Sequence, residues 1–241
     1  MLEFFTLINP GYCIFMSLLM IAMGAVSLVW YKKTKDVLFL IVSLVGVGLF
    51  YDMFITGIGY AISDLSAFEA IGMMRHVFHG LLTPLILVYV YIIFRRYEMI
   101  KHKAIDIGMA VFVVGIMVWA IVAIFTSPVE IVEIADVIRH SMDNENAHFL
   151  ANLIFNMLSF GTLVPMGIGA FITIKKQRDF NLLWAIVAMF GFTIIGVIFD
   201  TDLIFVTSFI GEGCIMLFYF LYAHKQYKLA QDKEKSAVLN K

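Results

Sequence analysis

The sequence is poor in charge and in the features that accompany charge in soluble proteins. Only 15% of its 241 residues are charged, 62% are hydrophobic, and the mean hydropathy is +0.94. A soluble domain carries roughly 25% charged residues, so the composition argues against a soluble fold. The net charge of −1 provides no basic field for nucleic acid, and we expect no nucleic-acid partner.

Cysteine and several chemical motifs are also scarce or missing. Cys13 and Cys214 both lie inside apolar segments, where they form neither a disulfide framework nor a metal-binding spacing. The sequence has no GxSxG motif and no glycine-rich phosphate loop. Its last apolar segment lacks the lysine that forms a retinal Schiff base, and it also lacks the HxxxH pair of ceramidase-like hydrolases. These absences argue against a rhodopsin and against the better-known membrane hydrolases.

Long apolar runs are what the sequence has in abundance. A membrane-spanning helix needs about 20 predominantly apolar residues. Seven segments reach that length, namely 11–31, 37–61, 72–94, 105–126, 148–174, 181–199 and 203–223. We therefore predict an all-α fold, with one seven-helix transmembrane domain over 1–223 and a polar cytoplasmic tail over 224–241. Among the connections, only 127–147 is long enough to hold structure of its own.

The distribution of basic residues predicts the orientation of these segments. Of the 17 Lys and Arg residues, 15 follow the first, third, fifth or seventh segment, and the exceptions are Arg75 and Arg139. Cytoplasmic loops of membrane proteins carry the excess of Lys and Arg. The N-terminus is therefore predicted to lie outside and the C-terminus in the cytoplasm. We expect a multi-pass protein of a bacterial-type plasma membrane.

Ionisable residues inside the apolar segments are the candidates for function. Each costs about 2.5–3.5 kcal/mol on insertion scales, so each requires a partner or a role. Asp52 lies within the second segment and Glu212 near the middle of the seventh. A carboxyl at this depth must be protonated, paired or hydrated. We take these two acids, with His76 and His79 of the third segment, as candidate catalytic residues.

A second set of polar residues falls at the same depth. The candidate substrate-binding residues are Tyr51, Arg75, Thr83, His148, Asn152, Asn156, Asp200 and Ser208. Three of them follow the i, i+4, i+8 spacing of one helix face in the fifth segment. One polar cavity, opening toward the outer face or the outer leaflet, would satisfy both sets.

Some of these residues also have structural explanations. Arg75 and His76 can extend to lipid headgroups, and Asn152 and Asn156 can bond neighbouring helices. Asp200 can cap a turn.

Three mechanisms use these residue types. A carboxylic acid kept neutral by an apolar site can protonate an alkene or epoxide of a prenyl lipid, with aromatic rings stabilising the cation. Alternatively, His76, His79 and His148 with Asp52 or Asp200 would bind zinc and hydrolyse a lipid. The third possibility is a proton-coupled transporter or a small-lipid-binding protein, in which the acids and histidines relay protons.

The chain resembles the integral-membrane terpene cyclases of meroterpenoid pathways. The resemblance rests on the length, the seven segments, and one acid each on the second and seventh, Asp52 and Glu212. It implies that a prenyl chain is closed by protonation of its terminal epoxide or alkene, with these two acids as catalytic groups. Asp52 stands in Phe50-Tyr51-Asp52-Met53, where the family tends to have Trp-Glu. The segment Arg75-His-Val-Phe-His-Gly-Leu-Leu-Thr-Pro84 is not a feature that we associate with the family.

The leading expectation is therefore a membrane-embedded enzyme, an isomerase or lyase of class II cyclase type, acting on an isoprenoid or related lipid. Asp52 or Glu212 would be the general acid, His76 or His79 would tune that acid, and Arg75 would orient it. This scheme needs no metal and no cofactor. No feature of the sequence indicates which protein partners it has.

Overall fold

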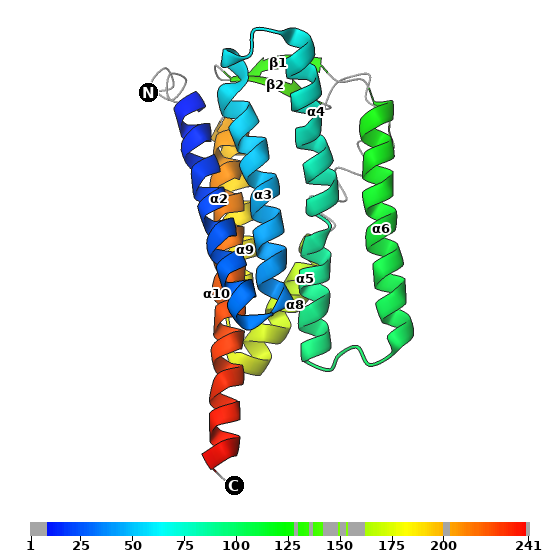
Figure 1. The fold of residues 1–241 in the computed structure, drawn as a ribbon, viewed down its shortest axis with the longest axis vertical. Coiled ribbons are helices and arrows are strands. Elements are labelled where there is room, and N and C mark those ends of the chain that lie inside the picture. The colour runs from blue at the N-terminus through cyan, green and yellow to red at the C-terminus, as the bar shows by residue number, and fades with distance from the viewer. Residues whose placement is uncertain are drawn as a thin grey trace.

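The computed structural model is a bundle of helices with a small hairpin at one end (Figure 1), and it describes residues 9–127, 130–134, 137–141, 149, 153, 162–199 and 203–239. The helices of this part of the chain are α2 (Asn9–Thr34), α3 (Val37–Ile58), α4 (Leu65–Leu82), α5 (Leu85–Arg96), α6 (Lys103–Thr126), α8 (Leu163–Gln177), α9 (Asn181–Phe199) and α10 (Leu203–Leu239). A 3₁₀ turn, η1 (Gly59–Ala61), follows α3. The strands are β1 (Glu130–Ile134) and β2 (Val137–Ser141).

Within the described part of the chain, four helical stretches are long and apolar enough to cross a membrane. They are Pro10–Thr34, Val37–Ala61, Ser66–Arg96 and Lys103–Thr126. Asn181–Gly196 is a shorter apolar helix. An all-helical membrane bundle, as predicted from the sequence, is compatible with these lengths.

Two aspartates fix where α3 and α4 begin. Asp36 accepts a hydrogen bond from the Leu38 backbone N–H at 2.9 Å, and Asp64 accepts one from the Ser66 N–H at 2.9 Å. These side chains satisfy N–H groups that a helix leaves without internal partners. The second apolar segment, predicted over 37–61, therefore starts at its predicted first residue.

The third apolar segment differs from its prediction of 72–94. It begins at Leu65, because the Asp64 cap lets the polar residues after it join the first turns of α4. It is also divided, since α4 ends at Leu82 and α5 starts at Leu85. Pro84 has no N–H to donate to the carbonyl four residues earlier, so the helix is interrupted there.

The predicted loop 127–147 contains the antiparallel hairpin of β1 and β2, which lies over the ends of α3 and α4 (Figure 1). A Cβ at Gly59 would lie 2.4 Å from the Ile138 carbonyl oxygen, so only glycine permits this approach. The Tyr60 hydroxyl donates to Glu133 Oε1 at 2.5 Å. Val137 is fully buried. We call this end of the bundle the outer end and the opposite end the inner end.

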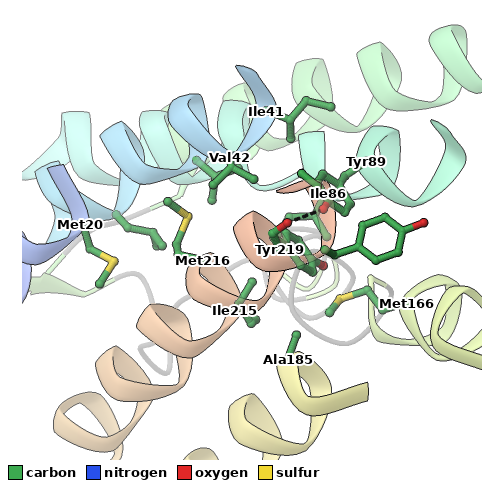
Figure 2. Close-up of a cluster of buried hydrophobic side chains, with 14 of the residues drawn as sticks. Met20, Ile41, Val42, Ile86, Tyr89, Met166, Ala185, Ile215, Met216 and Tyr219 are labelled. Carbon is green, nitrogen blue, oxygen red and sulfur yellow. Dashed lines mark hydrogen bonds between the residues drawn. The ribbon is translucent and has the colours of Figure 1, made fainter. Parts of the chain in front are cut away.

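One core cluster runs along the bundle, with side chains from α2, α3, α5, α8, α9 and α10 packed together (Figure 2), and it reaches Val137 of the hairpin at the outer end. Tyr89 of α5 stacks on Tyr219 of α10 with ring centroids 4.4 Å apart, and its hydroxyl donates to the Tyr219 carbonyl at 2.7 Å. Glycines let α2 and α3 approach closely, since a Cβ at Gly46 would lie 3.2 Å from Gly24 Cα.

The basic residues gather at the inner end of the bundle. α2, α5 and α8 finish there with Lys or Arg in their last turns, and α10 projects beyond that end (Figure 1). α10 continues without a break to Leu239, so the predicted tail after residue 223 continues the same helix.

Candidate functional site

The centre of the candidate site is a buried ion pair between α3 and α4. The Arg75 Nε lies 2.7 Å from Asp52 Oδ1, and only 8% and 12% of the two side chains are exposed. α3 brings Asp52 to this position from the inner end, and α4 brings Arg75 from the outer end. An arginine is always charged, so this contact is a charge-assisted ion pair between a guanidinium and a carboxyl group.

His79 completes a group of three around the carboxylate. Its Nδ1 lies 3.8 Å from Asp52 Oδ2, which is an electrostatic contact longer than a hydrogen bond. It lies one helical turn after Arg75, so both side chains lie on the same side of α4. The side chain is 31% exposed, far more than those of its two neighbours. The imidazole is thus the part of this group that a ligand can reach.

The other candidates on these helices have more structural roles. The Tyr51 hydroxyl donates to the Ile71 carbonyl at 3.0 Å and so joins α3 to α4. His76 is buried beside Arg75 in the chain. Thr83 closes α4, where its N–H donates to the His79 carbonyl at 3.1 Å. His79 therefore stands in the last turn before the helix is interrupted at Pro84.

Glu212 lies on α10 and is partly buried, one turn after Ser208. The Tyr12 hydroxyl of α2 is close enough to interact electrostatically with its carboxyl group. Sequence reasoning missed Tyr12, because a single tyrosine in an apolar helix gives no sign of a partner two hundred residues away.

The depths of the two acids can be compared through one contact between α3 and α10. A Cβ at Gly46 would lie 2.7 Å from Met216 Cε, so these residues are level with each other. Asp52 is six residues outward of Gly46, and Glu212 is four residues outward of Met216. At a rise of 1.5 Å per residue, the two acids lie within about one helical turn of the same depth.

Four predicted residues, His148, Asn152, Asn156 and Asp200, lie outside the described part of the chain. The metal-binding hypothesis involved two of them. Within the described residues, no group of three His, Cys, Asp or Glu side chains could hold a metal ion.

A second buried carboxylate lies at the inner end, in the connection between the predicted fifth and sixth segments. Asp179 sits between α8 and α9, its side chain is not exposed, and its Oδ2 is 3.1 Å from Lys225 Nζ of α10. Its Oδ1 accepts from the Asn181 N–H at 2.9 Å. Nearby, Gln177 and Gln226 bond each other between α8 and α10. This carboxylate holds a turn in place, which gives it a structural role.

Comparisons with known proteins identified no family for this chain. A scan against protein-family models found no match, and a search of curated proteins found none either.

Proposed function

We propose that this chain is a membrane-embedded enzyme that acts on an isoprenoid or related lipid by proton transfer. The most concrete reaction is proton-initiated, class II-type cyclisation of a prenyl chain. The proposal includes seven spans, the last over 203–223, with the N-terminus outside and the inner end in the cytoplasm of a bacterial-type plasma membrane. The gathering of basic residues at the inner end supports this orientation.

The observation that carries the proposal is the buried group of Asp52, Arg75 and His79. A buried ion pair is weak evidence for stability, because desolvation of two charges offsets their attraction. Asp52 also caps no helix and closes no turn. A carboxylate next to a partly exposed imidazole is, by contrast, a common arrangement for proton transfer. The geometry of these three residues therefore supports a role in proton transfer better than a purely structural role.

The ion pair changes which acid is proposed to donate the proton. The Asp52 carboxyl group lies 2.7 Å from a guanidinium and is therefore already engaged as an ion-pair partner. We therefore assign the general acid to Glu212, which lies on α10 within the apolar seventh segment. An apolar site favours the neutral, protonated form of such a carboxyl.

The proposed reaction proceeds in three steps. The Glu212 carboxyl transfers its proton to the terminal alkene carbon or epoxide oxygen of the prenyl chain. A neighbouring double bond then attacks the cationic carbon, and a ring bond forms. His79 finally accepts a proton from the carbon next to the last cation, and a new double bond forms there. Asp52 stabilises the imidazolium that results, while Arg75 orients Asp52. The product is an isomer of the substrate.

A proton-coupled transporter is the second candidate, and one observation favours it. His79 lies in the turn before the interruption at Pro84, and discontinuous helices form substrate and ion sites in many transporters. A transporter would move its substrate in response to a proton gradient and would leave it chemically unchanged.

The test is to supply the protein, reconstituted in vesicles, with prenyl substrates that end in an alkene or an epoxide. Glu212→Gln and His79→Gln should each reduce cyclised product by more than the roughly 10²–10⁴-fold that ordinary acid–base assistance provides. Glu69→Gln is the matched control, because Glu69 is exposed at the outer end and should tolerate the change. Full product formation by both site variants, or uptake without any product, would contradict the proposal.

A further inference from the structure

The turn between α2 and α3, at the inner end, carries an excess of positive charge. Lys32, Lys33 and Lys35 are all exposed there. The nearest carboxylate along the chain, Asp36, is already engaged, because its Oδ1 lies 2.6 Å from Arg96 and also accepts from the Leu38 N–H. Within the described residues, the ion pairs leave these three lysines without a carboxylate partner.

Two of the lysines lie over aromatic rings. Lys33 Nζ is 5.9 Å from the ring centroid of Trp30, and Lys35 Nζ is 5.9 Å from that of Tyr31. In this arrangement each ammonium group lies over a ring face within the range of a cation–π contact. Trp and Tyr beside Lys are typical of the level at which lipid headgroups lie.

The rings and the turn are held in place. The Trp30 ring stacks on Phe39 at 5.7 Å and meets the His224 ring edge-on at 4.6 Å, so it is fixed between α3 and α10. Lys35 has a φ of 58°, a left-handed conformation in which glycine is usual. Glu98 and Arg178 share this conformation just after α5 and α8, so it marks the end of a helix.

We propose that this turn binds the headgroup of an anionic phospholipid of the inner leaflet, with its phosphate between Lys33 and Lys35. The inference rests on the membrane placement in the proposed function, and it is independent of the chemistry proposed there. A zwitterionic headgroup fits less well, because its own ammonium group would lie beside two lysines. Each lysine near an anionic membrane surface contributes about 1 kcal/mol, which is about fivefold in affinity.

Trp30 provides a local reporter for the test. The chain has three tryptophans, so Trp119→Phe and Trp184→Phe leave Trp30 alone. Its fluorescence is then measured in vesicles that contain either brominated phosphatidylglycerol or brominated phosphatidylcholine, since bromine quenches a tryptophan that it contacts. We expect the anionic lipid to quench at several-fold lower mole fraction, and Lys33→Gln with Lys35→Gln to remove most of that preference.

Lys235→Gln is the control, because it removes one lysine charge by the same type of substitution, from the exposed, projecting part of α10. It should leave the lipid preference unchanged. Equal quenching by the two lipids, or an equal loss in the control and the double variant, would overturn the proposed lipid site. Absence of quenching by either lipid would overturn the membrane placement as well, whereas loss of the enzymatic reaction alone would leave this result unchanged.

Discussion

Asp52 and Asp179 are both buried carboxylates that pair with a basic side chain from another helix, yet their surroundings differ. Asp179 lies in a turn, bonds the Asn181 N–H at the start of α9, and meets a lysine that is 41% exposed. Asp52 lies within α3, and its arginine is 8% exposed. The buried Asp179 stabilises the turn between α8 and α9, whereas the buried Asp52 stabilises neither a turn nor a helix end. The difference separates a structural charge from a candidate functional one.

The largest loss of stability should come from removing the positive charge of Arg75, which pairs with Asp52. Arg75→Gln leaves the Asp52 carboxylate buried without its partner, and we expect the free energy of unfolding to fall by about 3–5 kcal/mol. Adding Asp52→Asn to this variant should recover most of that loss, because no charge is then left buried. Chemical denaturation in mixed micelles measures both. If Arg75→Gln costs less than 1 kcal/mol, the pair is not desolvated in the membrane.

A smaller effect is expected from the corresponding change at the inner pair. Lys225→Gln leaves Asp179 with its backbone hydrogen bond, and water can reach the site through the exposed lysine position. The loss should be about 1–3 kcal/mol by the same assay. A loss larger than that of Arg75→Gln would reverse the comparison between the two carboxylates.

The smallest loss among the ion pairs is expected at the turn between α5 and α6. Arg95 Nε lies 3.3 Å from Asp106 Oδ1, and each side chain is 37% exposed. Solvent screens such a pair, so Arg95→Gln should cost less than about 1 kcal/mol. Raising the salt concentration should reduce this small loss further but should change the Arg75→Gln result little.

His224, at the inner end, predicts a weak dependence of stability on pH. Burial and the nearby Lys228 lower the pKa of His224 below its usual 6.5. Between the lowered value and 6.5, the unfolded chain binds the proton more readily than the folded chain does. Stability should therefore rise with pH through this window, and it should be lost as the pH falls through the window and level off below it. His224→Gln should remove this dependence, and an unchanged pH profile in the variant would assign it to another group.

Several parts of this structure could be predicted from the sequence because each depends on local chemistry. Apolar length predicted helices over the described parts of the apolar segments. The placement of Asp52 among apolar residues predicted that it needs a partner, but it could not say which one. That choice depends on the register between α3 and α4, which the hairpin contacts at Gly59 help to set. The role of Asp179 was missed because its burial is created by α10, far away in the sequence.

We propose that Glu212 is protonated and that Asp52 is ionised, and infrared spectroscopy distinguishes these two states directly. A protonated carboxyl group shows a carbonyl band that a carboxylate lacks. Each variant is compared with the wild-type protein in vesicles at neutral pH. We expect the carbonyl band of the wild-type protein to be missing from the spectrum of Glu212→Gln and to remain in the spectrum of Asp52→Asn. Loss of the band in Asp52→Asn, with the band retained in Glu212→Gln, would make Asp52 the proton donor and contradict the account.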